Sequence, residues 1–345
     1  MSRVLTLRDL NRATLARQLL LERRRLSPLE VIERLAGMQA QWAPAPYVGI
    51  WTRVSQFRRE TLERAVLRGD VLKPTVMRGT LHLVTARDYP IFFAALRDYL
   101  WWSDPESAVA GERAAAPLRR LYGDGAKAWG VARAHLEREH GLAEELTRRR
   151  AWYVARIRGH VLHAPETALW RLRKQTLYAA VPEPEEIDVQ AARRELVRRY
   201  LAAFGPASRA DVAAWSGMRI RDFAPALEAL EPLRRFQDET GRELLDLPRA
   251  PLPPPDTPAP VRFLPKWDNV LLGFADRRRV LPEEYRKVVI GKNGDVAQTF
   301  LADGFVAGTW RVVRGRVLVE PFEPLPRSVQ RDVDEESARL EAWLR

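Results

Sequence analysis

The sequence predicts an α+β fold of tandem winged-helix (helix-turn-helix) motifs followed by a C-terminal antiparallel β-rich element. Three observations predict it. Before residue 248, capped segments with helical periodicity dominate. Twice, such helices precede two short β-rich runs joined by turn residues, which is the winged-helix pattern. After a proline-dense stretch at 248–260, which reads as a semi-rigid linker, the pattern changes to strands and turns.

Residues 1–89 form the first expected unit. Ser27 is a good N-cap, Pro28 suits the first helical position, and Glu30 completes a capping box, so a helix begins here. Gly37 ends this helix because glycine takes positive φ without strain. The elements expected in the unit are helices at 7–21, from 28 to Gly37, and at 58–67, then a hairpin of 71–73 with 80–84.

A pair of carboxamides follows the helix that ends at Gly37. If the chain from Met38 to Gln41 is extended, Gln39 and Gln41 point to one side while Met38 and Ala40 turn inward. The pair then forms a polar site at the end of a buried helix. The alternative is that one or both amides merely cap backbone groups.

Two further units are expected before the linker. Residues 90–182 read as mostly helical, with a return at 159–163 that is either a second short wing or a plain loop. Residues 183–248 show helix, turn, helix and hairpin, with Ser208 as an N-cap and Gly217 as a stop. The expected helices are 91–100, 125–140, 146–159, 191–201, 210–216 and 220–230, and the expected hairpin joins 233–236 to 244–247 through a turn at 239–242.

The last unit, residues 249–345, contains the linker, a β-hairpin-rich element and a closing helix. Short β-rich runs alternate with glycine-containing turns, which favours an antiparallel meander. The expected strands are 262–265, 287–290, 298–302, 305–313 and 316–319, the turns are 291–294, 303–304 and 314–315, and the closing helix is 327–344.

The composition indicates which class of molecule the protein binds. The 345 residues carry 57 Lys and Arg against 45 Asp and Glu, a net charge of +12, which makes a polyanion such as nucleic acid the leading partner. There is no cysteine, and the five histidines show no metal-ligand spacing, so we expect no metal and no cofactor. No apolar run approaches a membrane span, and the N-terminus lacks a signal-peptide pattern. We therefore expect a cytoplasmic protein, associated with the nucleoid when bound to DNA.

Five ordered segments resemble the winged-helix DNA glycosylases of the AlkZ and YcaQ type over nearly the whole chain. They are LAGMQAQ at 35–41, MRGTLHLV at 77–84, FGPASRAD at 204–211, LPKWDNVLLG at 264–273 and ADGFVAGTW at 302–310. The resemblance implies a C-shaped fold around a concave basic channel for duplex DNA. It also implies excision of N-alkylated purines, chiefly N7-alkylguanines, by a monofunctional enzyme without lyase activity, with release of crosslinked guanines or self-protection against a genotoxic natural product in some members.

The family's catalytic motif is Gln-x-Gln in the AlkZ type and Gln-x-Asp in the YcaQ type, so the resemblance assigns catalysis to Gln39 and Gln41. An alkylated guanine leaves as a neutral base, and no strong general acid is then required. We expect the two amides to hold a water against the anomeric carbon. Trp42 is a candidate to stack on a base, and His82 is a further site candidate, although a histidine in an apolar run is more often structural.

Cationic residues at expected wings, helix starts and hairpin tips are candidate DNA contacts. A charge run can equally be a solvated face. Asp268 and Asp276, which precede the arginine run 277–279, could form an acid site beside a phosphate clamp, but a structural role in which they bond their own backbone is favoured. The candidate DNA-binding residues are Lys73, Arg78, Arg209, Arg219, Arg277, Arg278, Arg279, Lys292, Asn293, Arg314 and Arg316.

Two non-enzymatic interpretations stay open. A winged-helix regulator can use glutamine to pair with adenine, although recognition helices usually read bases from their N-terminal residues. A lesion-binding shield would bind an adduct without releasing it. In each case the partner is double-stranded DNA, carrying alkylated purines in the enzymatic and shield interpretations, and a monomer is expected because tandem winged helices supply more than one DNA contact.

Overall fold

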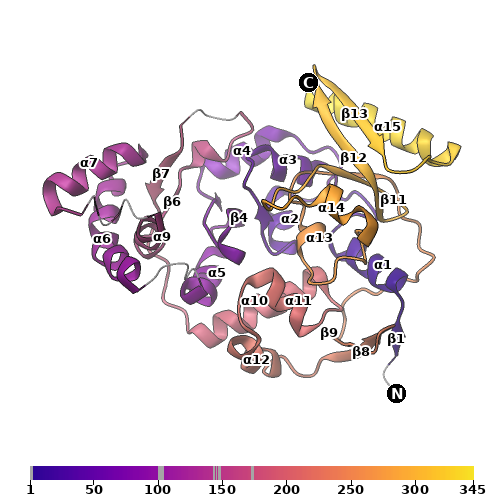
Figure 1. Ribbon diagram of the computed structural model, residues 1–345, viewed down its shortest axis with the longest axis horizontal. Coiled ribbons are helices and arrows are strands. Elements are labelled where there is room, and N and C mark those ends of the chain that lie inside the picture. The colour runs from indigo at the N-terminus through magenta and orange to yellow at the C-terminus, as the bar shows by residue number, and fades with distance from the viewer. Residues whose placement is uncertain (1–2, 100–104, 143, 145, 147–148, 172–174) are drawn as a thin grey trace.

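The computed structural model describes residues 3–99, 105–142, 144, 146, 149–171 and 175–345. Within that part of the chain, helices surround four small sheets with strand orders β1-β8-β9, β2-β4-β3, β5-β7-β6 and β10-β11-β12-β13. A lobe of α6, α7 and α9 lies at one end of the molecule, and β12, β13 and α15 lie at the other (Figure 1). The α+β class is confirmed.

The first unit brings its helices against the sheet that carries Gln39. Thr6 and Ser27 each close a capping box, as predicted for Ser27. The first helix ends earlier than residue 21, and Leu19 takes a positive φ of 57° beyond it. The elements are α1 (Leu7–Arg17), α2 (Pro28–Arg34), α3 (Pro44–Trp51) and α4 (Arg59–Leu67), with β2 (Met38–Gln39), β3 (Val71–Leu72), η1 (Met77–Gly79) and β4 (His82–Thr85).

The second unit is helical with a small sheet. The return at 159–163 contains the strand β6, which pairs antiparallel with β7, so this segment is not a plain loop. Helix α6 was not predicted, and part of the helix expected at 91–100 lies outside the described residues. The elements are α5 (Tyr89–Leu96), η2 (Arg97–Tyr99), α6 (Pro105–Gly123), β5 (Lys127–Ala128), α7 (Trp129–His140), α9 (Arg149–Arg158), β6 (Val161–His163), η3 (Pro165–Thr167) and β7 (Leu177–Ala180).

The third unit matches its prediction closely. Ser208 caps α11 with a capping box, and Gly217 ends that helix at a φ of 84°. The hairpin of β8 and β9 gains β1 from the N-terminus as a parallel third strand. The elements are β1 (Val4–Leu5), α10 (Val189–Phe204), α11 (Arg209–Ser216), α12 (Ile220–Glu228), β8 (Arg234–Asp238) and β9 (Glu243–Asp246).

The C-terminal unit is an antiparallel meander with one correction. Residues 287–290, predicted as a strand, lie largely in the short helix α14, in which Val288 is exposed and Val289 is buried. The turn at 291–294 therefore follows a helix. The elements are β10 (Arg262–Leu264), α13 (Asn269–Leu272), η4 (Glu283–Tyr285), α14 (Arg286–Val289), β11 (Thr299–Ala302), β12 (Phe305–Val313), β13 (Arg316–Pro321) and the predicted closing helix α15 (Arg327–Leu344).

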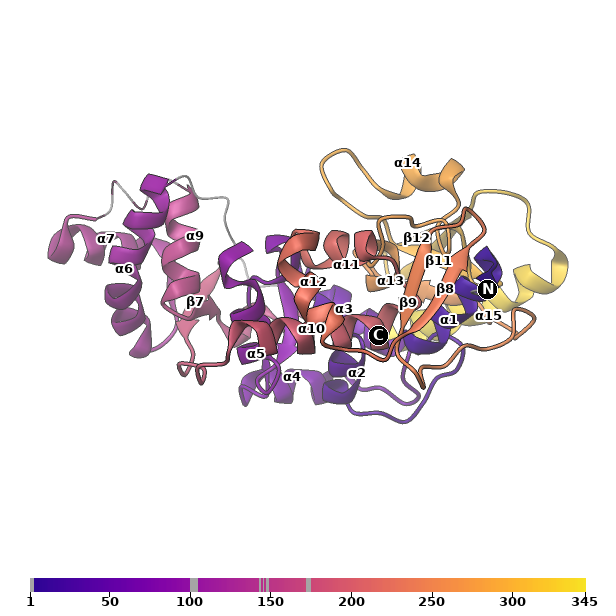
Figure 2. The same ribbon diagram turned by 90° about the horizontal axis from the view of Figure 1, so that it is seen from below.

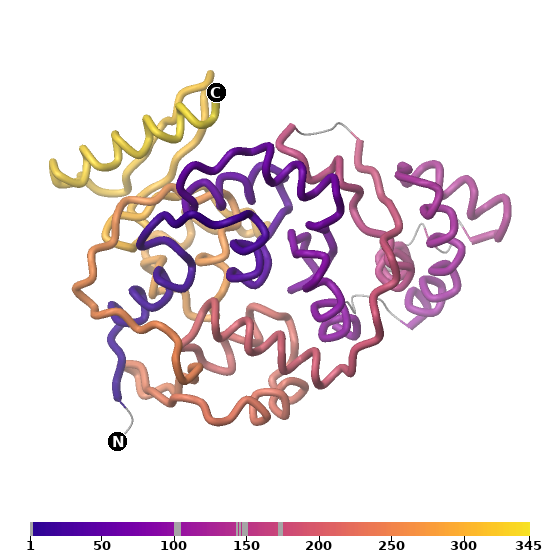
Figure 3. Tube along the Cα trace, turned by 180° about the vertical axis from the view of Figure 1, so that it is seen from behind, coloured from indigo at the N-terminus to yellow at the C-terminus, as the bar shows by residue number. Residues whose placement is uncertain are grey.

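Buried ion pairs tie the N-terminal segment to distant parts of the chain. Arg17 lies 2.7 Å from Asp246, and Arg53 lies 2.8 Å from Asp268, with all four side chains almost fully buried. Removing one partner from such a pair leaves an uncompensated buried charge. Seen from behind, the start of the chain, in indigo, lies beside the C-terminal unit, in orange (Figure 3). No helix in the described part combines the length and apolar character that crossing a membrane requires.

Candidate functional site

The glutamine pair lies on and just after an edge strand. After α2, Ala36 and Gly37 take φ values of 55° and 86°, which turn the chain into β2. Strand β2 pairs antiparallel with β4, and Gln39 stands directly opposite His82. Met38 and Ala40 are buried in the core. Met38 and Ala40 therefore turn inward as predicted, and Gln39 and Gln41 leave the backbone on the other side, where Gln41 is exposed and Gln39 is only 7% exposed beside Arg78.

Both carboxamide oxygens accept hydrogen bonds from the protein. The Oε1 atom of Gln39 accepts from Nη2 of Arg78 at 2.8 Å, and that of Gln41 accepts from the backbone N–H of Leu81 at 2.7 Å. Because both partners are donors, the orientation of each amide is defined. The alternative considered for these amides was that they cap backbone groups. Gln41 does form such a bond, to the backbone N–H of Leu81. Each oxygen keeps a second lone pair, and each NH₂ group has no bond to a described residue.

Arg78 connects the pair to the third unit. Its Nη1 atom donates to the carbonyl of Trp215 at 2.6 Å, and burial, aided by the nearby charge of Arg277, lowers its pKa to about 10. Arg78 takes a φ of 53°. A Cβ atom on Gly217 would lie 3.3 Å from the Arg78 backbone, so glycine permits this approach. The structure thus places the Arg78 guanidinium beside Gln39, with two of its five N–H donors bonded to described residues.

His82 lies beside Gln39 and is neutral. It is 2% exposed, and its Nδ1 atom lies 3.1 Å from the carbonyl of Thr80, which it can only approach as a donor. Burial, together with the charge of Arg78, lowers its pKa to about 3. The structure therefore brings His82 to the glutamine pair, but as an uncharged group at neutral pH.

Asn269 is a site-building residue that was not predicted from the sequence. Its Nδ2 atom donates to the carbonyl of Gly37 at 2.7 Å and to that of Leu35 at 3.2 Å. Asn269, far along the chain from Gln39, thereby holds the turn that precedes Gln39. The neighbouring Asp268 caps α13 and pairs with Arg53, so its structural role is confirmed. Asp276 binds Arg278 and also accepts the backbone N–H of that residue.

Two candidate DNA contacts are corrected by their burial. Arg279 is 2% exposed, donates to the carbonyl of Pro206, and lies over the ring of Phe274. Lys73 is 6% exposed, and its Nζ atom donates to the carbonyl of Thr167, with a pKa that burial lowers to about 8. Neither cation faces solvent, so neither is available to a phosphate in this conformation.

The other candidate contacts retain exposed or half-buried cations. Arg209, Arg219, Arg278 and Arg316 are each paired with a carboxylate, on Glu243, Asp222, Asp276 and Glu341 respectively. Arg277 is half-buried. Lys292, Asn293 and Arg314 are exposed, and within the described chain Lys292 and Arg314 make no ion pair. No group of three or more described His, Cys, Asp or Glu side chains could hold a metal ion.

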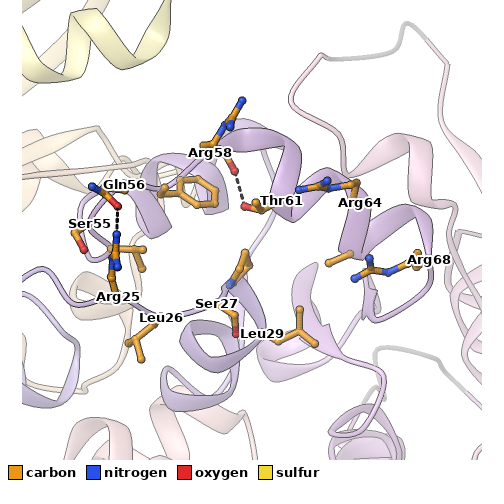
Figure 4. A pocket seen from close by; sticks show the side chains of 14 residues that line it. Arg25, Leu26, Ser27, Leu29, Ser55, Gln56, Arg58, Thr61, Arg64 and Arg68 are labelled. Carbon is orange, nitrogen blue, oxygen red and sulfur yellow. Dashed lines mark hydrogen bonds between the residues drawn. The ribbon is translucent and has the colours of Figure 1, made fainter.

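A separate basic hollow lies away from the glutamine pair. It has a volume of about 510 Å³ and is bordered by four arginines, one from the segment before α2 and three from α4 and its flanks (Figure 4). Figure 2 places α2 and α4 along one edge of the molecule and α14 along the opposite edge. The arginines that border it are Arg25, Arg58, Arg64 and Arg68.

Comparison with known proteins agrees with this fold. A curated protein of Streptomyces sahachiroi, named an interstrand DNA cross-link repair glycosylase, is 24% identical over 359 residues, covering 94% of this chain and 92% of that protein. The solved structure of the Streptomyces sahachiroi DNA glycosylase AlkZ matches with a TM-score of 0.82 at 20% identity, over 99% of this chain and 97% of that one. At that identity it shows the shared fold alone. The model of the family described as DNA glycosylase AlkZ-like matches residues 32–343, and the chain belongs to this family.

Proposed function

We propose that this protein is a monofunctional DNA glycosylase that hydrolyses the N-glycosidic bond of N-alkylated purines in double-stranded DNA, chiefly N7-alkylguanine. Bulky adducts and interstrand crosslinks from a genotoxic natural product are included in the proposed range. The observation that carries the proposal is the polar cluster of Gln39, Gln41 and His82 where edge strand β2 pairs with β4, with Gln39 fixed by Arg78. The relative named for crosslink repair supports the same reaction class.

The chemistry requires water placement more than acid catalysis. Cleavage builds positive charge on the sugar while a cationic N7-alkylguanine departs as a neutral base. The second lone pair of each glutamine oxygen accepts an O–H of one water, whose own lone pair then faces the anomeric carbon. Arg78 and the Leu81 N–H hold these oxygens before substrate arrives, so little reorganisation is needed.

The composition of the cluster favours a reaction that stops at the abasic site. Among the described residues, no carboxylate or amine hydrogen-bonds to Gln39, Gln41, Arg78 or His82. A lyase step requires an amine to attack the sugar, and neutral His82 cannot donate a proton at pH 7. Uncharged amides also add no repulsion toward the developing cation.

The test is single-turnover excision of N7-methylguanine by Gln39→Ala and Gln41→Ala variants, alongside DNA-binding measurements. We expect each variant to bind lesion DNA with near wild-type affinity and to release the base at least about 100-fold more slowly, as expected when a positioning contact is lost. Wild-type rates in both variants would remove the assignment of catalysis to this pair. Tight binding without release by the wild type would instead identify a regulator or lesion shield.

We also propose the wider arrangement that this function requires. Units 1–89, 90–182 and 183–248 act as winged helices, and 249–345 contributes the β-rich element, together forming a C-shaped channel around DNA. The exposed cations Lys292 and Arg314, with Asn293, Arg316, Arg209, Arg219, Arg277 and Arg278, are the proposed backbone contacts. A monomer acting on DNA in the cytoplasm suffices, because the contacts come from one chain.

A further inference from the structure

The basic hollow at α2 and α4 has an apolar floor. Val54, Phe57 and Ala65 line it and are buried members of the core, and Leu26 and Leu29 pack half-buried against the same cluster. The volume of about 510 Å³ falls in the range of small-ligand sites. Covering such a floor with an apolar side chain removes apolar surface from water and is favourable.

The rim of the hollow is cationic on both sides. Figure 4 shows Arg25 on one side and Arg64 and Arg68 on the other, with Ser27 and Leu29 between them. All four arginines that border the hollow are exposed, and its lining contains no acidic side chain. The rim therefore attracts carboxylates, while the floor accepts an apolar group.

Two neighbouring acids are engaged elsewhere. Glu30 accepts hydrogen bonds from the backbone N–H and the hydroxyl of Ser27, and Asp70 pairs with Arg68 at 2.7 Å. Within the described part of the chain, Arg64 makes no ion pair. The protein itself thus leaves positive charge at the rim uncompensated.

The hollow is separate from the glutamine site and from the proposed DNA contacts. Gln39 and Gln41 do not line it, and Trp42 borders a different cavity. Helices α2 and α4 lie along the edge of the molecule opposite α14, and Lys292 and Asn293 come shortly after α14 (Figure 2). A duplex backbone offers phosphates but no apolar side chain for the floor, so the hollow matches a protein segment better than DNA.

We propose that the basic hollow docks an acidic segment of a partner protein. An aromatic or branched aliphatic side chain of that segment rests on the floor formed by Val54 and Phe57, and the carboxylates that flank it bond to Arg25 on one side and Arg64 on the other. The inference goes beyond the proposed function and does not depend on it.

The experiment measures the binding of a fluorescein-labelled peptide, four aspartates followed by phenylalanine, to the full chain by fluorescence anisotropy. Two comparison peptides replace the phenylalanine by serine, or every aspartate by asparagine. We expect saturable binding of the first peptide. Each comparison peptide should bind about tenfold or more weakly, because one lacks the ring that the floor buries and the other lacks the charges that the rim attracts.

Arg64→Glu tests the place of binding, with Arg120→Glu as its matched control. Both arginines are exposed, lie in the last turn of a helix and make no ion pair within the described chain, but Arg120, on α6, does not line the hollow. Arg64→Glu should weaken peptide binding about fivefold or more, because it replaces an attraction by a repulsion, and Arg120→Glu should change it by less than about twofold. Thr61→Trp fills the hollow from α4 and should abolish the preference for phenylalanine over serine.

The absence of saturable peptide binding, or equal weakening by Arg64→Glu and Arg120→Glu, would overturn the inference. It would also be overturned if Arg64→Glu weakened binding of an unmodified DNA duplex more than binding of the peptide, because the hollow would then be a nucleic-acid contact. Arg64→Glu should excise N7-methylguanine near the wild-type rate. The peptide assay needs no base release, so failure of this inference and failure of the proposed function are read from separate measurements.

Discussion

Replacing Asn269 by alanine should slow base excision, although Asn269 is not among the proposed DNA contacts. The side chain amide bridges the carbonyls of Leu35 and Gly37, at 3.2 Å and 2.7 Å. Gln39 follows Gly37 by two residues, and the turn between them depends on a positive φ of 86° at Gly37. Without the bridge, the turn is free to shift and Gln39 shifts with it.

Two magnitudes follow from this geometry. Loss of two hydrogen bonds to backbone carbonyls should cost about 1–3 kcal/mol of unfolding free energy, since each bond contributes roughly 0.5–1.5 kcal/mol. A displacement of about 1 Å in a positioning group can cost about 100-fold in rate. We therefore expect Asn269→Ala to excise N7-methylguanine about 10- to 100-fold more slowly under single-turnover conditions.

The structure offers a matched control for the stability loss. Asn11 also donates its Nδ2 atom to two carbonyls, those of Arg279 and Gly304, at 2.7 Å and 2.8 Å, and it is fully buried. Asn11→Ala should destabilise the protein by at least as much and leave excision near the wild-type rate. Excision at the wild-type rate by Asn269→Ala, or equal slowing by both variants, would refute the positioning role of Asn269.

Three further predictions test the packing, the titration and the DNA interface. Asp268→Ala should lower the unfolding free energy by about 3–5 kcal/mol because it leaves Arg53 buried and unpaired; a loss under about 1 kcal/mol in denaturant titrations would contradict this. His82 has a folded pKa of about 3, below its unfolded value, so its contribution is full above about pH 6.5 and declines as the pH falls toward 3. Between pH 8 and 5.5, the wild type should lose about 1.4 kcal/mol more unfolding free energy than His82→Gln, and parallel losses would exclude a neutral buried histidine. Arg314 is exposed and forms no ion pair within the described chain, so Arg314→Ala should reduce the slope of log affinity against log salt for duplex DNA by about 1, and an unchanged slope would remove it from the interface.

Local signals were the part of the fold that the sequence predicted well. The capping boxes at Ser27 and Ser208 depend on residues three apart, and α15 has a sustained helical period, so these elements appear as expected. Helix α3 was not predicted; prolines disfavour a helix interior, but Pro44 and Pro46 both fall within its first turn, where proline is tolerated. The run at 287–290 reads as a strand by composition, but tertiary packing buries Val289 on a helical turn.

The candidate site was likewise predictable where it depends on neighbouring residues and not where it depends on distant ones. Alternation after Gly37 predicted which side Gln39 and Gln41 occupy, since that depends on neighbouring residues. The groups that hold them come from far along the chain: Asn269 is 232 residues from Gly37, and Arg78 spans to the Trp215 carbonyl. A single sequence carries no signal for such pairs. The burial of Arg279 and Lys73 was equally hidden, because charge alone does not tell a solvated cation from a buried one.

The most direct test of the central claim is base release from a duplex carrying one N7-methylguanine, incubated with the purified protein and a chelator in place of added metal. We expect free 7-methylguanine and an intact strand bearing an abasic site, with release abolished in the Gln39→Ala/Gln41→Ala double variant. Undiminished release by the double variant, or strand cleavage accompanying release, would contradict a monofunctional glycosylase that uses this glutamine pair.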